Sequence, residues 1–387
     1  MLSKLELFAE ACAKLDKRGI VMQEKRCLRK RHIHSSCQRC SDICPTGAIT
    51  CTESLVFLGE KCSGCGACAT VCPSGALAAK LPSNREISAL VFHHVKHSGA
   101  VAFACETYLK VHPAERRRVI SVQCIARCDE AILVAAVLSG ATHVAILNTA
   151  CEDCVQNKVC AQVQVVVDTA NRLLACWKYP QLITITPTIP QKIKPLPVAE
   201  GEVTGMSRRN FLTAFKRKSE SLVTQVLPEI ILTTEETSAK NNNEIENPLE
   251  EPKHLPDKWR ALFDSLQRLP STAVSEFPST IWGDIRIDSS CNGCGTCADA
   301  CPSSALTIHK QQELWRLSVD VSHCTQCGLC KDVCCRGSIE VISTVALNEI
   351  LDQKSQVLVE KRQEEIDTLL EPIEDRMARL LGCSVKN

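Results

Sequence analysis

Two cysteine-rich stretches in the C-terminal part of the chain decide its fold. They read CNGCGTCADACP at 291–302 and CTQCGLCKDVC at 324–334. In each stretch three cysteines recur at every third position, and a fourth follows the last of them after three intervening residues. Bacterial proteins with two [4Fe–4S] clusters use this spacing, in which three close thiolates bind one cluster and the fourth cysteine binds the neighbouring cluster. The spacing therefore predicts a module that holds two clusters through interleaved ligands.

Interleaving assigns four cysteines to each cluster of this module. The expected sets are Cys291, Cys294, Cys297 with Cys334 (site III) and Cys324, Cys327, Cys330 with Cys301 (site IV). Cys335 stands directly after Cys334, where a proline is expected, so either thiol is a candidate ligand. These motifs resemble the dicluster ferredoxin family. The resemblance implies a ferredoxin-like α+β module and a role in electron transport.

A second pair of cysteine runs near the N-terminus repeats this pattern with one change. The later run is complete, whereas the earlier run has only three cysteines, at 37, 40 and 44. Cys27, which precedes an insertion at 28–36, is the best substitute, and Cys51, Cys12 or a three-iron cluster are the alternatives. The expected sets are Cys27, Cys37, Cys40 with Cys72 (site I) and Cys62, Cys65, Cys68 with Cys44 (site II).

The composition favours iron over the other uses of cysteine. The chain has 27 cysteines, and its first residues lack the apolar core of a secretion signal. It also lacks the run of about 18 apolar residues that spans a membrane. We therefore expect a cytoplasmic protein without an integral membrane segment, in which thiols stay reduced. Zinc sites use separated cysteine pairs or cysteine with histidine, so these tight runs favour iron–sulfur clusters.

The charge balance bears on the partners. The 45 basic and 44 acidic residues leave a net charge of +1, and only 4% of the residues are aromatic. Neither number favours binding of nucleic acid. The insertion at 28–36 and the residues before it are locally basic, which suggests a solvated face, a docking patch for an acidic partner, or a positive field near a cluster.

The segment between the two modules has the pattern of alternating strands and helices. Apolar runs predict strands at 101–105, 119–124, 143–148 and 182–186. Helical periodicity predicts helices at 87–97, 130–138 and 159–174. We expect a small open parallel α/β sheet covered by helices.

Cysteines follow three of these strands. Cys105 and Cys124 end two strands, and Cys151 and Cys154 come soon after a third. The carboxyl ends of parallel strands form the binding crevice of an open sheet, so these thiols should converge. Two more cysteines are candidate members of the group, Cys128 and Cys160.

The stretch VQCIARCDE at 122–130, followed by Gly140 and Cys151, resembles the hydrogenase iron–sulfur (delta) subunit family. That family is known from methyl-viologen-reducing hydrogenase and heterodisulfide reductase complexes. The resemblance implies a CheY-like domain with a [2Fe–2S] cluster, at positions that match Cys105, Cys124, Cys151 and Cys154. This chain departs from the family in two ways: no second cysteine follows Cys105 closely, and the spacing from Cys151 to Cys154 is short.

These patterns divide the chain into five parts. We expect an N-terminal helix with a dicluster module (1–82), the α/β domain (83–188), a linker with short helices and a disordered tether (189–280), a second dicluster module (281–343) and a C-terminal helix (344–387). The tether is placed at 233–256, where prolines and asparagines replace apolar residues.

The expected function is electron transfer. The chain is predicted to relay low-potential electrons between a dehydrogenase or hydrogenase and a reductase, with redox proteins such as a flavin subunit as partners, in an anaerobe. One alternative is an electron-input subunit of a catalytic complex with a substrate or flavin site, for which His93, His94, Arg127 and Glu106 are candidate residues. Another alternative is a redox-sensing or assembly scaffold.

Overall fold

The computed structural model describes residues 19–51, 55–197, 254–270 and 276–369. The described residues up to Pro195 and from His254 onward belong to one compact unit. The expected N-terminal helix, most of the tether and residues 198–253 of the expected linker lie outside the described residues. No helix among the described residues is long and apolar enough to cross a membrane.

The N-terminal module is built from short elements around the cysteine runs. In chain order these are β1 (Ile20–Met22), α2 (Leu28–Arg31), α3 (Arg39–Ile43), β2 (Ile49–Cys51), β3 (Leu55–Phe57), α4 (Ala67–Val71) and β4 (Leu77–Ala79). β1 pairs antiparallel with β4, and β2 pairs antiparallel with β3. The strand before the first run thus closes on the strand after the second run, which brings the two runs together.

The C-terminal module repeats this arrangement. Its elements are β10 (Asp284–Ile287), α11 (Thr296–Ala300), β11 (Leu306–Gln311), β12 (Leu314–Asp320), α12 (Leu329–Asp332) and β13 (Ile339–Ile342). β10 pairs antiparallel with β13, while β11 and β12 form the hairpin between the runs. The repeat expected from the sequence is therefore also a repeat of strand pairing.

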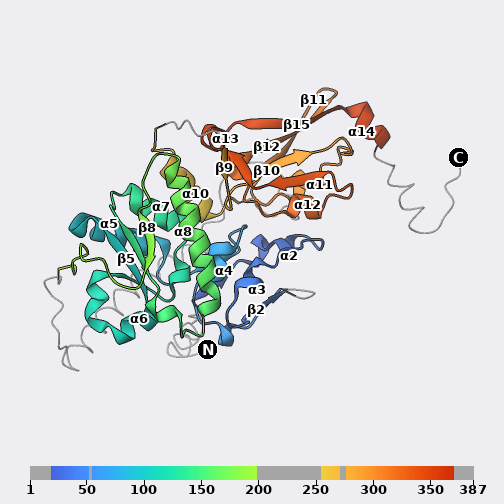
Figure 1. The fold of residues 1–387 in the computed structure, drawn as a ribbon. Coiled ribbons are helices and arrows are strands. Elements are labelled where there is room, and N and C mark those ends of the chain that lie inside the picture. Colours follow the sequence, from blue (N-terminus) through green and yellow to red (C-terminus); the bar gives the residue numbers. More distant parts are fainter. Residues whose placement is uncertain (1–18, 52–54, 198–253, 271–275, 370–387) are drawn as a thin grey trace, which may run out of the picture. The chain divides into compact units, whose positions relative to one another are not determined.

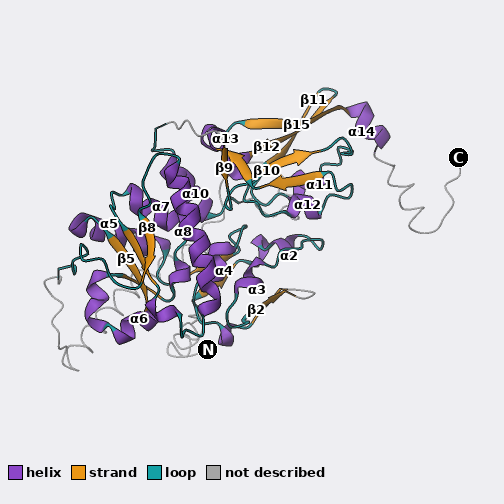
Figure 2. Ribbon diagram, in the orientation of Figure 1, coloured by secondary structure: helices purple, strands orange, loops and turns teal. Residues whose placement is uncertain are grey.

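Four parallel strands form the sheet of the middle region (Figures 1 and 2). They are β5 (Val101–Cys105), β6 (Ile120–Val122), β7 (Val144–Leu147) and β8 (Ile183–Thr186), in the spatial order β6-β5-β7-β8. β5 and β7 are buried along their whole length, as expected for central parallel strands covered on both faces, whereas in β8 Ile183 is buried and the other residues are half-buried. The strands lie where the apolar runs predicted them, shorter by up to three residues.

Five helices accompany this sheet. They are α5 (Asn84–Ser98), α6 (Glu106–Val111), α7 (Glu130–Leu138), α8 (Cys160–Ala175) and α10 (Asp257–Leu266). Ser83 and Glu86 form a capping box at the start of α5, and Asp129 caps α7 through the N–H of Ile132. α7 is buried along nearly its whole length because α5, α8 and α10 all pack against it.

α10 joins the linker to the core rather than standing apart from it. Trp259, Leu262, Phe263 and Leu266 are all buried. The indole N–H of Trp259 donates to the carbonyl oxygen of Ile281, and Lys258 donates to the carbonyl oxygen of Thr70. The apolar stripe of this helix is therefore core packing, and the helix contacts residues of both cysteine-rich modules.

The structure corrects two boundaries. The linker predicted at 189–280 contributes β9 (Glu276–Pro278), which pairs with β14 (Thr344–Ala346) and so extends the C-terminal module. The predicted C-terminal helix at 344–387 is wrong over about half of its described length. Residues there form β14, α13 (Leu347–Asp352) and β15 (Ser355–Arg362), and α14 (Gln363–Leu369) is the helix that follows.

The second correction has a physical reason. β15 pairs antiparallel with β12 and satisfies the backbone groups on the edge that β11 leaves open. Val357 and Val359 are β-branched residues, which fit a strand better than a helix. The many charges around these residues favour a helix in the sequence alone, and the pairing of β15 with β12 depends on residues about 40 positions away.

Candidate iron–sulfur sites

Four cysteines from separate segments surround one cavity of the N-terminal module. Cys27 immediately precedes α2, Cys37 lies two residues before α3, Cys40 lies in the first turn of α3, and Cys72 follows α4. All four line the same cavity, which is the arrangement expected for site I. Cys51, the alternative at the end of β2, lies beside Cys40 but is not among the described residues that line this cavity. Cys12 lies outside the described residues.

Site II combines the remaining cysteines of the two N-terminal runs. Cys44, Cys62, Cys65 and Cys68 line a second cavity of the same module. Cys44 comes from the first run and the other three come from the second run. The two sites also adjoin, since the Cys68 sulfur is close enough to Cys72 of site I for their charges to interact.

The C-terminal module brings its cysteines together in the same interleaved way. The Cys297 sulfur interacts electrostatically with Cys294, Cys291 and Cys334, which are the expected members of site III. The Cys330 sulfur interacts in the same manner with the expected members of site IV, Cys327, Cys324 and Cys301. Cys335 is exposed, and Cys334 is the member of the adjacent pair that faces Cys297.

Backbone N–H groups point at many of these sulfurs. Cys27 accepts from the N–H groups of Arg29 and Lys30, Cys37 from that of Arg39, and Cys65 from that of Ala67. Cys324 and Cys327 accept from the N–H groups two residues ahead in the same way. Hydrogen bonds to cluster sulfurs are one of the means by which proteins tune iron–sulfur centres. The loops therefore offer donors as well as thiols.

Burial favours the protonated form of several of these thiols. Burial raises the pKa of Cys297 and Cys324 to about 12, and that of Cys327 to about 11. Burial also acts on Cys44 and Cys334, but hydrogen bonds from the loop that follows each cysteine outweigh it and lower the pKa. Because only the thiolate binds iron, loading most of these sites must release protons.

The thiols of sites I and II surround cavities in the way a cluster requires. No group of three or more His, Cys, Asp or Glu side chains in the described part of the chain is placed to hold one metal ion. A cubane cluster carries its irons at separate corners, so its thiolates are spread around a volume instead of converging on a point. Four thiols around a cavity, with N–H donors aimed at their sulfurs, fit a [4Fe–4S] cluster.

The middle region assembles a further group of thiols at the carboxyl ends of its strands. The Cys124 sulfur lies near Cys105 and Cys154, and the Cys151 sulfur lies near Cys105 and Cys124. All four cysteines expected here are thus brought together. Cys105 and Cys154 accept backbone N–H groups, from Tyr108 and Gln156, at 3.4 Å.

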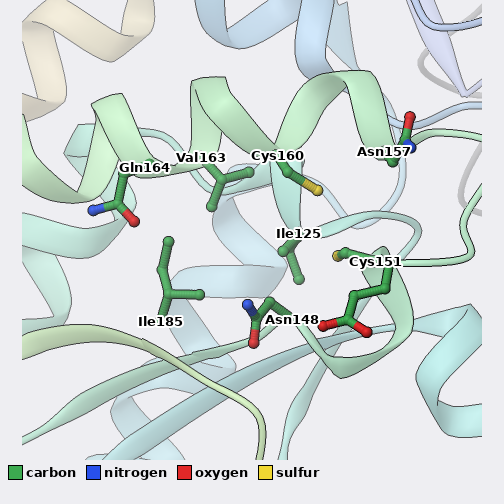
Figure 3. A pocket seen from close by; sticks show the side chains of 9 residues that line it. Ile125, Asn148, Cys151, Asn157, Cys160, Val163, Gln164 and Ile185 are labelled. Carbon is green, nitrogen blue, oxygen red and sulfur yellow. The ribbon is translucent and has the colours of Figure 1, made fainter.

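Two further cysteines, one on α8 and one in the N-terminal module, lie next to this group. Cys160, at the start of α8, forms a side-chain hydrogen bond with Cys151, and both face a cavity of about 360 Å³ (Figure 3). Cys65 of site II is the cysteine whose charge acts most strongly on Cys124. Burial is the main reason that the pKa of Cys124 rises to about 12, and these neighbouring sulfurs add to it. The group therefore adjoins site II.

Two of the residues considered for a catalytic role, Glu106 and Arg127, have partners within the described structure. Glu106 forms an ion pair with Arg116, 2.8 Å between Oε2 and Nη2, and contacts Ser121. Arg127 is buried and bonds to Asn84 and to the carbonyl oxygen of Pro82. Burial is the main cause that lowers the pKa of His94 to about 4, so its imidazole is neutral at pH 7.

Two family models match the chain, one in each cysteine-rich module. Residues 290–338 match a model described as a 4Fe-4S dicluster domain. Residues 34–81 match a model described as an LdpA Fe-S cluster-binding domain. The chain carries iron–sulfur cluster-binding domains. The first match includes all eight cysteines of sites III and IV, and the second includes those of sites I and II apart from Cys27. No curated protein and no solved structure matched the chain.

Proposed function

We propose that the chain is a multi-cluster electron carrier with four [4Fe–4S] clusters. The ligands of sites I and II are Cys27, Cys37, Cys40, Cys72 and Cys44, Cys62, Cys65, Cys68. The ligands of sites III and IV are Cys291, Cys294, Cys297, Cys334 and Cys301, Cys324, Cys327, Cys330. One observation carries this proposal: each group of four sulfurs draws its members from two segments, in the interleaved order that bacterial dicluster proteins use.

We propose a fifth centre in the middle region, a [2Fe–2S] cluster bound by Cys105, Cys124, Cys151 and Cys154. The mutual proximity of these thiols supports it, as do the N–H groups that point at Cys105, Cys124 and Cys154. The strand order β6-β5-β7-β8 agrees with the first four strands of the CheY-like order and supports a CheY-like domain. Cys160 is a fifth thiol beside this centre.

Such a protein would relay low-potential electrons between a dehydrogenase or hydrogenase and a reductase, in the cytoplasm of an anaerobe. Iron–sulfur clusters accept and donate single electrons, and this chemistry needs no substrate pocket. The residues of the chain supply thiolates, N–H donors and burial, which hold the clusters and set their potentials.

The experiment is anaerobic purification followed by iron and sulfide counts, and by reduction with dithionite under EPR. We expect signals of reduced [4Fe–4S] clusters, and one-electron transfer from reduced viologen to the clusters of the oxidised protein. Retention of zinc in place of iron would contradict the proposal. So would iron that is present but cannot be reduced.

The cavity beside Cys151 and Cys160 favours one further candidate function, an electron-input subunit with its own substrate or flavin site. This cavity of about 360 Å³ opens next to the proposed fifth centre and carries polar groups from Asn148 and Gln164 (Figure 3). Flavin bound to the purified protein, or turnover with reduced viologen as the sole donor, would distinguish this function from a carrier. A carrier would show neither.

A further inference from the structure

The insertion between Cys27 and Cys37 contacts the C-terminal module. Leu28, its first residue, is 2% exposed and packs with Leu329 and Val333 in a small apolar cluster. Cys37 and Cys327 are partly buried against the same cluster. Cys37 belongs to site I and Cys327 to site IV, so cysteines of two different modules pack against the same apolar cluster.

Polar contacts fasten the end of the insertion at the same place. The backbone N–H of Ser36 donates to Asp332 Oδ2 at 2.8 Å, and the Ser36 hydroxyl donates to both carboxylate oxygens of Asp332, at 3.1 and 2.9 Å. Asp332 ends α12, which carries Cys330 of site IV. The insertion therefore has a structural partner within the chain.

Arg39 stands between the two sites. Its Nη2 donates to the carbonyl oxygen of Gln326 at 2.6 Å, in the loop that carries Cys327. Its backbone N–H donates to the Cys37 sulfur, and its positive charge acts on both Cys37 and Cys327. A single guanidinium is thus close to one cysteine of site I and one of site IV.

We propose that Arg39 is a positioning residue that joins site I to site IV and favours the reduced state of both. Its hydrogen bond to Gln326 fixes the distance between the modules, and its charge stabilises an added electron on either side. The inference rests on the proposed function, since it requires clusters at both sites. It also gives the insertion a role: the insertion builds the contact between the modules.

The size of the effect is limited by solvent. Arg39 is only half-buried and lines a cavity of about 460 Å³ together with Asp42, whose carboxylate opposes its charge. Glu130 and Lys258 line the same cavity. We therefore expect its removal to change the equilibrium constant for reduction of each cluster between twofold and tenfold, and a tenfold change in a one-electron reduction corresponds to about 59 mV.

The test is an anaerobic redox titration followed by EPR on the full chain. Arg39→Gln should lower the potentials of two clusters, whereas Arg39→Lys, which keeps the positive charge, should hold both potentials near the wild-type values. Cys40→Ser and Cys330→Ser variants assign the two clusters to sites I and IV. Arg286→Gln removes the same charge from an exposed position of β10 and serves as the matched control. The inference is overturned if Arg39→Gln shifts one site alone, shifts neither, or shifts no more than the control.

Two further measurements keep the outcomes apart. If Arg39→Gln loses the iron of site I, the test rests on site IV, which lies in the other module. A potential of site IV lowered more than in the control then supports the inference, and an unchanged potential overturns it. Asp332→Ala should narrow the EPR signals of the reduced protein, because a loosened contact weakens the magnetic interaction between the clusters of sites I and IV. Unchanged signals would contradict a close contact between these two sites.

A wild-type protein without four clusters would end both the proposed function and this inference. Four clusters with no response to Arg39→Gln would end the inference alone.

Discussion

Replacing Lys258 by methionine tests how α10 is held against the rest of the protein. Lys258 Nζ lies 2.5 Å from Glu130 Oε2 on α7, and it also donates to the carbonyl oxygen of Thr70 in α4 at 3.1 Å. The two charged side chains are 13% and 4% exposed. Methionine keeps much of the length of the lysine stem but removes the charge and the donor.

The expected loss is large because the substitution leaves a buried carboxylate without its cation. Breaking a buried ion pair on one side costs about 3–5 kcal/mol. Both residues line the cavity of about 460 Å³, so water can reach part of the site and lessen the penalty. We therefore place Lys258→Met near the lower end, at about 3 kcal/mol in the free energy of unfolding.

Anaerobic urea titration followed by far-UV circular dichroism measures this loss. A double variant with Glu130→Gln should recover to within about 1 kcal/mol of the wild type, because no uncompensated charge remains. Lys354→Met is the matched control: Lys354 pairs with Asp352 at 3.0 Å, but the side chains are 78% and 48% exposed, so its loss should stay below about 1 kcal/mol. Equal losses for Lys258→Met and Lys354→Met would refute the reasoning, as would a double variant no better than the single one.

Three other predictions follow from the same contacts. Gly295→Ala should cost about 1 kcal/mol more than Gly337→Ala in urea unfolding: both glycines have positive φ, but a Cβ at Gly295 would lie 2.6 Å from Cδ1 of Ile308, whose side chain must shift, whereas Gly337 faces open space. Equal costs would contradict it. The pKa of His94 is lowered in the folded protein, so the unfolded state binds an extra proton below pH 6.5 and stability should fall as the pH drops toward 4. From pH 7 to 5.5 the wild type should lose about 1 kcal/mol more than His94→Leu, and a parallel loss in both would refute this. Cys124→Ser should remove about two irons and leave the others, whereas Cys128→Ser should remove none. Identical iron counts in the two variants would disprove the assignment.

The grouping of the cysteines could be predicted from the sequence because the information is local and repeated. Three thiols at every third position must share one loop, and the fourth must reach elsewhere. That rule anticipated that Cys72 would join Cys27 and Cys37 around one cavity, and that Cys44 would join the other group. The predicted ends of the strands gave similar information about the middle region. Cys105 and Cys124 follow neighbouring parallel strands, so the sequence predicts that they lie together at one edge of the sheet.

Features that depend on distant partners were not accessible. β15 was read as helix because its strand character depends on pairing with β12. The insertion after Cys27 looked like a basic surface segment, and only the structure shows Leu28 and Ser36 against the C-terminal module. The proximity of Cys65 to Cys124 likewise depends on how two domains pack, and a linear pattern does not carry that.

The central claim is that these thiols bind four iron–sulfur clusters in two interleaved modules. The most direct test is the iron and acid-labile sulfide content of the anaerobically purified chain, measured together with that of a Cys72→Ser, Cys301→Ser double variant. Four cubanes should give the wild-type chain about sixteen irons and sixteen sulfides, and the fifth centre should add about two of each. The double variant should lose iron and sulfide at sites I and IV alone. A colourless protein that retains zinc, or a variant that loses iron at sites II and III instead, would contradict it.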